Sequence, residues 1–488
     1  MNHNRLLFER LHSSNPLTAF IFFFILCQTF VSAQIIAGGG YYSFVLCKDG
    51  TVRTWGSNVS GQLGDSTFDN KNIPVLVKGL SGVIAIAGEG NHSIALKSDS
   101  TVWCWGFNTH GELGDESFNN KKNIPVKAVG LSGVIAIAAG ENHCLALRKD
   151  STVWAWGWGY YGQLGNGMAM STVPAKVDSI SGVIAIAAGS YHSLALKKDG
   201  TMWAWGNNGS GELGSANNLP AEYPQRVVDL SNVKSIAGTA ANSYAIKNDG
   251  TVWAWGGNTY FQLGNKTEAL ATVPRLVSGL SGITVITGGF QHSLALKNDG
   301  TVWAWGNNSA GQLGNGVIDS NEVYEYHPTQ VKNLSGVVAV TGGGTHSLAV
   351  KSDGTVWAWG YNYHGQLGNG TNTEYYNLPV KVSGTWQALT GVAVRNNLPE
   401  GFSLSQNYPN PFNPSTAIEF TLQTAGITSL KIYDAIGREV ATLANNEMLE
   451  SGVYHQKQFN ARNLSSGVYF ARLVSGSNVQ MKKMMLLK

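Results

Sequence analysis

The chain has 488 residues, of which 43% are hydrophobic and 13% charged, with 60 glycines and 15 tryptophans. This length exceeds that of one ordinary small domain, and abundant glycine with little charge favours an all-β protein over a helical one. The net charge is +3, but the first 33 residues contribute +1 and residues 401–488 contribute +3, so the central region is near −1. A near-neutral region without a basic run argues against nucleic-acid binding.

Residues 1–33 have the features of a secretory signal peptide. Arg5 and Arg10 give a basic start, residues 16–31 form a short apolar run, and Val31-Ser32-Ala33 provides a small-residue cleavage site. The alternative is a transmembrane anchor, but the apolar run is too short to span a bilayer comfortably. We therefore expect this segment to be removed on export.

Residues 34–396 repeat one motif, Thr-x-x-x-Trp-Gly, at intervals of 49 to 54 residues. Its seven copies begin at Thr51, Thr101, Thr152, Thr201, Thr251, Thr301 and Thr355. A fixed period of this size is typical of a solenoid or a propeller. Each unit predicts four short strands: an apolar run, then His-Ser-Leu-Ala-Leu-Lys, then Thr-Val-Trp-Ala-Trp-Gly after an Asp-Gly or Asp-Ser turn, and a last strand beyond Gly-Gln-Leu-Gly.

The alternation in the third strand predicts how the units stack. Trp303 and Trp305 share one face of the strand, and Val302, Ala304 and Gly306 share the other. The large face of one unit can therefore pack on the small face of a neighbour, and seven such sheets can close into a ring. We expect residues 386–394 to act as an eighth first strand, paired beside residues 34–40, that closes the ring.

The repeated pattern resembles the repeats of the regulator of chromosome condensation family. The resemblance implies a seven-bladed β-propeller of four-stranded blades over residues 34–396. The chain departs from the pattern in units one and five: Tyr42 and Asn242 replace the repeated histidine, Thr54 stands where most units have alanine, and Phe261 replaces the first glycine of Gly-Gln-Leu-Gly.

The composition changes beyond the repeats, in residues 397–488. Four prolines between residues 399 and 414 favour an extended segment, and alternating runs separated by turn residues then predict a small C-terminal β-sandwich. This region resembles the type A sorting domain of the type IX secretion system, at Asn410, Pro411, Phe412, Asn413, Pro414, Gly437, Arg438, Gly467, Tyr469, Lys482 and Lys483. The resemblance implies a Bacteroidetes-type bacterium, recognition by the type IX machinery, and a secreted or outer cell-surface location. The alternative is an accessory sandwich without a sorting role.

Five histidines occupy equivalent positions at the start of the second strand: His92, His143, His192, His292 and His346. A ring of imidazoles could bind a metal, but a residue repeated in five of seven units is more simply explained as scaffold that bonds backbone of its own or the next blade. The sequence has no nucleophile elbow, zinc or calcium motif, or phosphate-binding loop. We therefore predict no catalytic residues, metal or cofactor. Cys47, Cys104 and Cys144 match no metal spacing and are interpreted as small buried hydrophobes.

The residues that differ between units are better candidates for function. Four residues separate Trp-Gly from Gly-Gln-Leu-Gly in each unit, and we call them the tip. Aromatic and histidine residues gather at or beside the tips, and we predict that they bind a partner: Phe107, His110, Trp158, Tyr160, Tyr161, Tyr260, Phe261, Tyr361, Tyr363 and His364. The alternative is local packing against the next blade. Polar loops at residues 65–72, 115–123 and 318–328 are further candidates.

These features favour a secreted or cell-surface binding module for an unknown protein or glycan, acting as a monomer and meeting membrane only through export or surface attachment. A hydrolase scaffold is the alternative. Guanine-nucleotide exchange, the activity of the family's namesake, is the least favoured function because export separates the chain from cytoplasmic GTPases.

Overall fold

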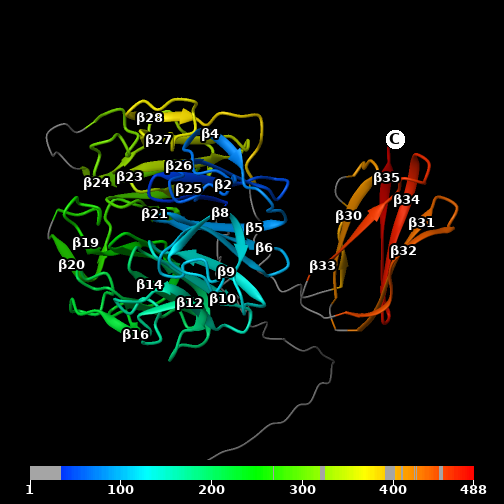
Figure 1. Cartoon of the computed structure of the whole chain (residues 1–488), viewed down its shortest axis with the longest axis horizontal. Helices are drawn as coiled ribbons and strands as arrows, with labels where there is room; N and C mark the ends of the chain where they lie inside the picture. The colour runs from blue at the N-terminus through cyan, green and yellow to red at the C-terminus, as the bar shows by residue number, and fades with distance from the viewer. Residues whose placement is uncertain are drawn as a thin grey trace, which may run out of the picture.

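A computed structural model describes residues 35–266, 269–318, 325–390, 402–407, 410–422, 424, 426–449 and 454–488. All regular secondary structure in these residues is β-strand, which confirms the all-β prediction (Figure 1). No helix in the described ranges is long and apolar enough to cross a membrane. The predicted signal peptide, residues 1–33, lies outside the described residues.

Seven antiparallel four-stranded sheets follow one another along the repeats, each with its strands in chain order. Blades 1 to 4 contain β1 (Ile36–Gly38), β2 (Tyr42–Leu46), β3 (Val52–Gly56), β4 (Lys71–Leu76); β5 (Val83–Glu89), β6 (His92–Lys97), β7 (Val102–Asn108), β8 (Asn120–Lys127); β9 (Val134–Ala139), β10 (His143–Arg148), β11 (Val153–Trp158), β12 (Met170–Lys176); β13 (Val183–Ala188), β14 (His192–Lys197), β15 (Met202–Gly206), β16 (Ala221–Arg226).

Blades 5 to 7 contain β17 (Val233–Thr239), β18 (Asn242–Lys247), β19 (Val252–Gly257), β20 (Leu270–Leu276); β21 (Ile283–Gly288), β22 (His292–Lys297), β23 (Val302–Gly306), β24 (Glu325–Gln330); β25 (Val337–Gly342), β26 (His346–Lys351), β27 (Val356–Tyr361), β28 (Tyr375–Lys381). Neighbouring first strands contact each other, and β25 of blade 7 contacts β1 of blade 1. The first strands therefore form the inner circle, and the chain makes a closed seven-bladed propeller in which blades 1 and 7 are neighbours (Figure 1).

The ring closes differently from the prediction. Residues 387–389 do not pair beside residues 34–40; they pair with the end of the second strand, through a bridge between Ala388 and Cys47. The Ala388 amide also donates to the Gly354 carbonyl at 3.0 Å, as the Val83 amide donates to Gly50. Ala388 thus takes the position that Val83 holds in blade 2, and it extends a first strand that is too short. Residues 391–394 of the expected strand lie outside the described residues.

The tryptophan of the Trp-Gly pair in the third strand holds each blade to the one before it. Trp305 is fully buried, and its indole Nε1 donates to the Gln262 carbonyl of blade 5 at 2.9 Å. The opposite face of the same strand, with Val302 and Ala304, packs in one core cluster with Trp359 of blade 7. The predicted contact of a large face with a small face is confirmed, and each blade covers the small face of its predecessor.

The C-terminal region is a small sandwich of two sheets. One sheet has the order β29-β30-β33 and the other β32-β31-β34-β35. Their bounds are β29 (Ser403–Leu404), β30 (Ser415–Thr421), β31 (Gly426–Asp434), β32 (Glu439–Leu449), β33 (Tyr454–Asn460), β34 (Gly467–Ser475) and β35 (Asn478–Leu486). Buried residues from both sheets, including Phe420 and Leu430, form one core, as expected for a sandwich. The predicted boundary at residues 396–397 lies outside the described residues.

Candidate functional site

The five repeated histidines lie between blades rather than in a site. Each imidazole Nε2 lies 2.8 to 2.9 Å from a serine Oγ of the next blade, except that of His92, which lies 3.2 Å from the Cys144 Sγ. The serine pairs are His143–Ser193, His192–Ser243, His292–Ser347 and His346–Ser43. Each serine donates its proton to a backbone carbonyl of the histidine's own blade, so Nε2 is the donor in these pairs. The partner is a side chain of the next blade, where the sequence suggested backbone.

The two blades that lack the histidine make the same connection with tyrosine. In blade 1, Ser93 donates to the Tyr42 hydroxyl at 2.9 Å. In blade 5, Tyr244 lies two residues after Asn242 in the same strand, and its hydroxyl is 2.7 Å from the Ser293 Oγ. The histidine contact therefore links one blade to the next, and a tyrosine makes that contact in the two blades that lack the histidine.

Burial keeps the histidines uncharged. It lowers the pKa of His92 to about 4 and that of His143, His192, His292 and His346 to about 3. Within the part of the chain that the structure describes, no three histidine, cysteine or acidic side chains are close enough to hold a metal ion. The described cysteines are buried and free, as predicted; Cys144 fills the serine position of blade 3.

One face of the ring collects the variable residues. In every blade the glycine of the Trp-Gly pair in the third strand pairs with the first residue of the second strand, as Gly157 pairs with His143. The tip after the third strand and the loop before the second strand therefore emerge on the same face. We call this face the tip face. The tips lie toward its outer edge, and the loops between the first and second strands lie toward its centre.

Side chains of the turn hold each tip rigid. The glutamine or glutamate of the Gly-Gln-Leu-Gly turn accepts a hydrogen bond from the amide two residues before it, as Gln163 does from Tyr161 at 3.0 Å. In six blades the second tip residue is asparagine, and its side chain accepts from the leucine amide, as Asn362 does from Leu367 at 3.0 Å. The second tip position is therefore scaffold, and the first, third and fourth remain free to vary.

The richest group of rings spans blades 2 to 4. We call Trp158, Tyr160, Tyr161 and Tyr191 the tryptophan cluster. Trp158 lies between them: its ring centroid is 6.0 Å from that of Tyr160, 5.3 Å from that of Tyr161 and 5.6 Å from that of Tyr191. The predicted residues Phe107 and His110 extend it, since the His110 ring lies 5.4 Å from Trp158 and 6.5 Å from Phe107. Tyr160 is 72% exposed and the other rings are half-buried, so packing and exposure coexist.

Tyr191 was missed in the sequence because it belongs to a different loop. It precedes the repeated histidine, a position that reads Tyr41, Asn91, Asn142, Tyr191, Ala241, Gln291 and Thr345 in the seven units. This position varies as much as the tips do, and that variation was an available signal.

Two carboxylates lie beside the tryptophan cluster on the central side. Ser190 of blade 4 donates a hydrogen bond to the Glu89 Oε1 of blade 2 at 2.6 Å. Burial, with a smaller contribution from the Glu141 charge, raises the pKa of Glu89 to about 8. Burial and a hydrogen bond with Glu141 raise the pKa of Tyr191. The raised pKa keeps Glu89 mostly protonated near neutral pH, and Glu89 and Glu141 together place carboxyl oxygens that can form hydrogen bonds on this side of the cluster.

A second group lies where blade 7 meets blade 1. We call Tyr361, Tyr363, His364 and Tyr41 the tyrosine cluster. The His364 ring lies 5.2 Å from Tyr41 and 6.1 Å from Tyr363, and Tyr361 lies 6.1 Å from Tyr41. Tyr363 is 63% exposed and Tyr41 is 41% exposed. The structure thus brings these three predicted residues together and adds Tyr41.

The predicted pair Tyr260 and Phe261 lies apart from both clusters. Phe261 has φ of +59°, a conformation that glycine adopts at this position in the other six blades. A Cβ on the equivalent Gly61 would lie 2.7 Å from the Asn123 Cα of the next blade. In blade 5 the Phe261 ring instead packs against Tyr326 of β24, at 6.1 Å. Residues 319–324 of the polar loop beside it lie outside the described residues.

The sorting motif divides into residues that hold the sandwich and residues on its surface. Phe412 and Tyr469 belong to its core, and Gly437 makes a turn at φ of +82°. In that turn Arg438 Nε donates to the Asp434 carboxylate at 2.8 Å. The exposed or half-buried members are Pro411, Asn413, Pro414, Arg438, Lys482 and Lys483, with Asn410 and Gly467 also exposed.

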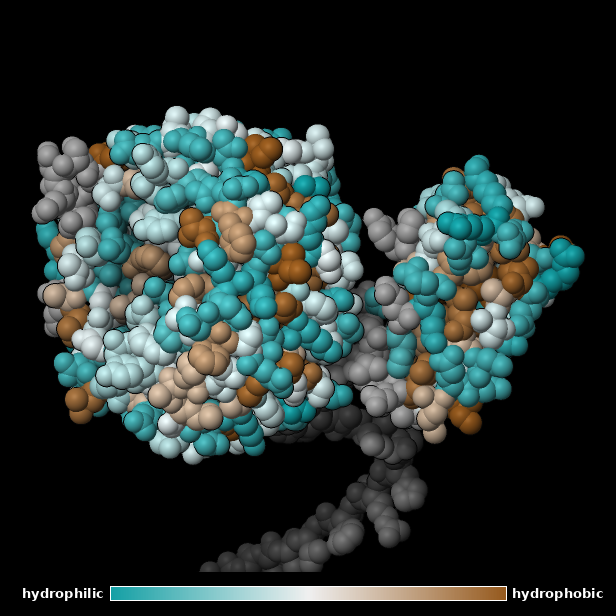
Figure 2. Space-filling model, in the orientation of Figure 1, coloured by the Kyte–Doolittle hydropathy of each residue, from teal (hydrophilic) through white to brown (hydrophobic). Residues whose placement is uncertain are grey.

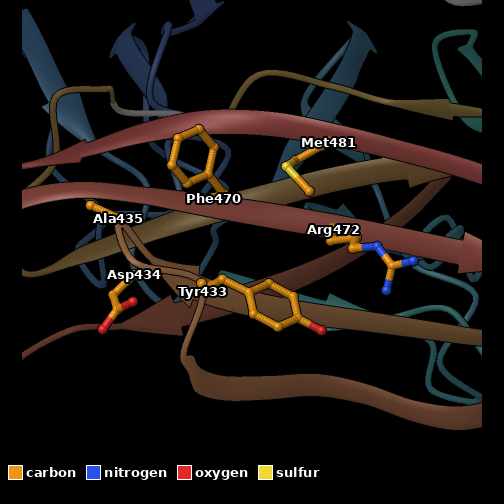
Figure 3. A pocket seen from close by; sticks show the side chains of 7 residues that line it. Tyr433, Asp434, Ala435, Phe470, Arg472 and Met481 are labelled. Atoms are coloured by element: carbon orange, nitrogen blue, oxygen red, sulfur yellow. The ribbon is translucent and has the colours of Figure 1, made fainter.

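The same turn borders a shallow pocket of about 350 Å³. Figure 3 shows its side chains from three neighbouring strands: Tyr433 from β31, Phe470 and Arg472 from β34, and Met481 from β35. Asp434, Ala435 and Gly437 complete it. The pocket therefore combines apolar side chains with an arginine, and Gly437 is the residue of the sorting motif that lines it.

Comparisons with known proteins agree with both parts of the chain. A family model described as RCC1-like domain matches residues 15–332 and 170–397, and one described as secretion system C-terminal sorting domain matches residues 406–487. The crystal structure of Prp20p from Saccharomyces cerevisiae is 26% identical with a TM-score of 0.63, over 74% of this chain and 88% of that one. Human WBSCR16, 23% identical with a TM-score of 0.62 over 68% of this chain and 95% of its own, supports the fold alone.

Curated relatives match over shorter stretches. The Schizosaccharomyces pombe protein pim1 is 36% identical over 91 residues, which are 18% of this chain and 16% of pim1. The human E3 ubiquitin-protein ligase HERC2 is 30% identical over 132 residues, 27% of this chain and 2% of HERC2. The chain therefore matches only a small fraction of either relative.

Proposed function

The chain belongs to the RCC1-like domain family and ends in a type IX sorting domain, and from this premise we propose that it is an exported binding module, secreted or held at the cell surface, that recognises a protein or a glycan through its tip face. We expect it to act by binding, without catalysis. The sorting domain supports export, and it implies contact with the type IX machinery.

The observation that carries this proposal is the tryptophan cluster. Trp158, Tyr160 and Tyr161 come from the tip of blade 3 and Tyr191 from a loop of blade 4, yet the four rings form one group that remains partly exposed on the tip face. Aromatic side chains of this kind offer a large contact area and lose little conformational entropy on binding. The turn glutamines fix the tip backbone before any ligand arrives, which lowers the entropic cost further.

Family membership alone does not choose the ligand, since one fold carries many functions. Prp20p is described with binding properties to Gsp1p and histones, which is an example of a similar propeller that binds proteins. Exchange activity on a cytoplasmic GTPase fits poorly with an exported chain.

Retention experiments test the binding proposal. Purified residues 34–488 would be incubated with outer-membrane proteins and with a glycan array. We expect a retained partner, and we expect the triple substitution Trp158→Ala, Tyr160→Ala and Tyr161→Ala to weaken retention at least tenfold while circular dichroism stays unchanged. No retained partner from either source would contradict the proposal, and loss of folding would assign these rings to packing.

Export is tested separately by deletion of residues 398–488. We expect the shortened chain to accumulate in the periplasm, because the machinery that carries it through the outer membrane no longer finds its signal. The control is the full chain with the aromatic triple substitution, which should be exported normally. Normal export of the shortened chain would contradict the sorting assignment.

A further inference from the structure

The tyrosine cluster repeats the tryptophan cluster position by position. Trp158, Tyr160 and Tyr161 are the first, third and fourth tip residues of blade 3, and Tyr361, Tyr363 and His364 are the same three residues of blade 7. Tyr191 and Tyr41 each precede the histidine position of the following blade. Both clusters are therefore built from four equivalent positions across one blade junction.

The geometry repeats as well as the positions. The first and third rings are nearly parallel in both clusters, with centroids 6.0 Å apart at 11° for Trp158 and Tyr160, and 6.4 Å apart at 19° for Tyr361 and Tyr363. The third and fourth rings meet at 80° in both clusters, for Tyr160 with Tyr161 and for Tyr363 with His364. The remaining three equivalent ring pairs are also in contact in both clusters.

The other five junctions lack this arrangement. The tips of blades 1, 4 and 6 read Ser-Asn-Val-Ser, Asn-Asn-Gly-Ser and Asn-Asn-Ser-Ala and contain no aromatic residue. Blade 2 has rings at two tip positions, but Asn142 follows in the next blade, and blade 5 has a ring at the fourth tip position alone. The two complete clusters are three blades apart in one direction and four in the other, so they lie almost opposite each other on the tip face.

We propose that the tip face is bivalent and that its ligand is an uncharged polysaccharide, which presents the same sugar ring to both clusters. This inference rests on the proposed binding function and names its ligand class. A polymer of one sugar carries the same recognised group many times, and two equivalent sites on one rigid face suit such a ligand.

The chemistry around the rings favours sugar. An aromatic face can cover the apolar C–H face of a sugar ring, and nearby oxygens can accept hydrogen bonds from its hydroxyls. Glu141 lies at Tyr191 in the tryptophan cluster, and Glu374 lies close enough to Tyr361 for its charge to raise the pKa of that tyrosine. No lysine or arginine in the described residues forms an ion pair or ring contact with either cluster, so nothing there would attract an anionic polymer.

The spacing of the rings argues against a broad protein interface. Protein interfaces concentrate their binding energy in one central, well-packed patch. Here the tips of blades 1, 4 and 6, which lie between the clusters, contain no aromatic residue, and only blades 2 and 5 carry further rings. On the side of the propeller seen in Figure 2, hydrophobic residues are likewise scattered in small groups among hydrophilic ones.

Stoichiometry and avidity test this proposal. The probes are cellulose, chitin, xylan and mannan, each as the polymer and as soluble oligosaccharides of four to six sugars. We expect one of these sugars to bind, with two oligosaccharides per chain by calorimetry and with the polymer held about 10²- to 10⁴-fold more tightly than the oligosaccharide.

Two exposed and equivalent tyrosines make the matched variants, Tyr160→Ala and Tyr363→Ala. Each should lower the affinity for the polymer at least tenfold and weaken one of the two oligosaccharide sites, and the double variant should bind neither form. Tyr223→Ala, at a tyrosine 47% exposed on β16 and outside both clusters, is the control and should bind as the unmodified chain does.

The contradicting results are distinct from failure of the proposed function. Loss of polymer binding in Tyr160→Ala but not in Tyr363→Ala, with one oligosaccharide per chain, would overturn the bivalent site and leave a single binding site. Retention of a protein that Tyr160→Ala abolishes, without retention on any of the four polysaccharides, would overturn the ligand class alone. Absence of binding to any protein or glycan would remove both proposals.

Discussion

Trp156 and Trp158 stand two residues apart on β11 and belong to two different regions of the molecule. Trp156 is fully buried at the junction with blade 2, where its Nε1 donates to the Glu112 carbonyl at 2.9 Å. Trp158 is half-buried at the tip face and contacts other rings there. Side chains two apart in a strand point the same way, so only the distance along the strand separates their environments.

The two positions also differ in how regularly their residue is repeated along the chain. The buried tryptophan occurs in all seven blades, because every blade must cover the small face of its predecessor. The position of Trp158 carries a different residue in most blades, because no neighbour dictates its shape. The comparison indicates that the repeated residues maintain the ring and the variable residues are available for recognition.

Acid should have the largest effect on the ring. The five histidines have an ordinary pKa near 6.5 when unfolded and about 3 to 4 when folded, so the unfolded chain binds more protons between these values. The contribution of the histidines to stability is therefore complete above pH 6.5 and falls as the pH decreases toward their folded pKa, by about 1.4 kcal/mol per pH unit for each histidine. We expect the urea midpoint to fall steeply between about pH 6 and pH 4.

Glu89 acts in the opposite direction. Its folded pKa of about 8 exceeds its unfolded value, so its contribution to stability decreases as the pH rises.

A single substitution isolates the effect of one histidine. His292→Gln cannot be protonated, so its stability should depend on pH less steeply, by about 1.4 kcal/mol per unit. A urea midpoint of the unmodified chain that is the same at pH 4 as above pH 6.5 would contradict this expectation. It would mean that the buried histidines accept protons in the folded ring.

Truncation of the two tryptophans sharpens the comparison next. Trp156→Ala should lower the free energy of unfolding by about 3 to 5 kcal/mol, because it removes a fully buried ring and leaves a cavity. Trp158→Ala is the matched control on the same strand and should cost less than half as much. Urea unfolding followed by circular dichroism measures both; equal costs would mean that the tip face is as much a packing region as the junction.

The tyrosine that makes the interblade contact of the missing histidine in blade 5 gives the smallest effect. Tyr244→Phe keeps the buried ring and removes the hydroxyl that lies 2.7 Å from Ser293. Ser293 still donates to the Gln262 carbonyl, so we expect a loss of about 1 kcal/mol in the free energy of unfolding. Tyr223→Phe on the blade surface serves as the control. A cost above about 3 kcal/mol would indicate that the hydroxyl organises more of the junction than this one contact.

The fold was predictable because its signals repeat. The alternation of Trp303 and Trp305 in the third strand predicted the stacking of the blades, and the seven copies of the motif at nearly regular intervals predicted their number. Closure was predicted less well: Ala388 occupies the Val83 position without resembling it, because a single residue completes the pairing that a short first strand leaves open. The sequence pattern indicated a further first strand over residues 386–394, but it did not show that this segment pairs with the second strand of blade 1.

The candidate site was predictable in part. Tip residues such as Tyr160 and Tyr363 stood out because they break the repeat, and the structure places them among other rings. Tyr191 and Tyr41 were missed because they belong to other loops, and only the pairing of the second and third strands brings those loops to the same face. The equivalence of the two clusters crosses from one blade to the next, so it becomes visible once the ring is closed.

The most direct test of this account compares ligand binding with folding for Trp156→Ala and for the triple substitution of Trp158, Tyr160 and Tyr161. The account predicts that the triple variant keeps a urea midpoint close to that of the unmodified chain and loses binding at least tenfold, whereas Trp156→Ala, while folded, loses stability and keeps its affinity. Undiminished binding by a folded triple variant would contradict it.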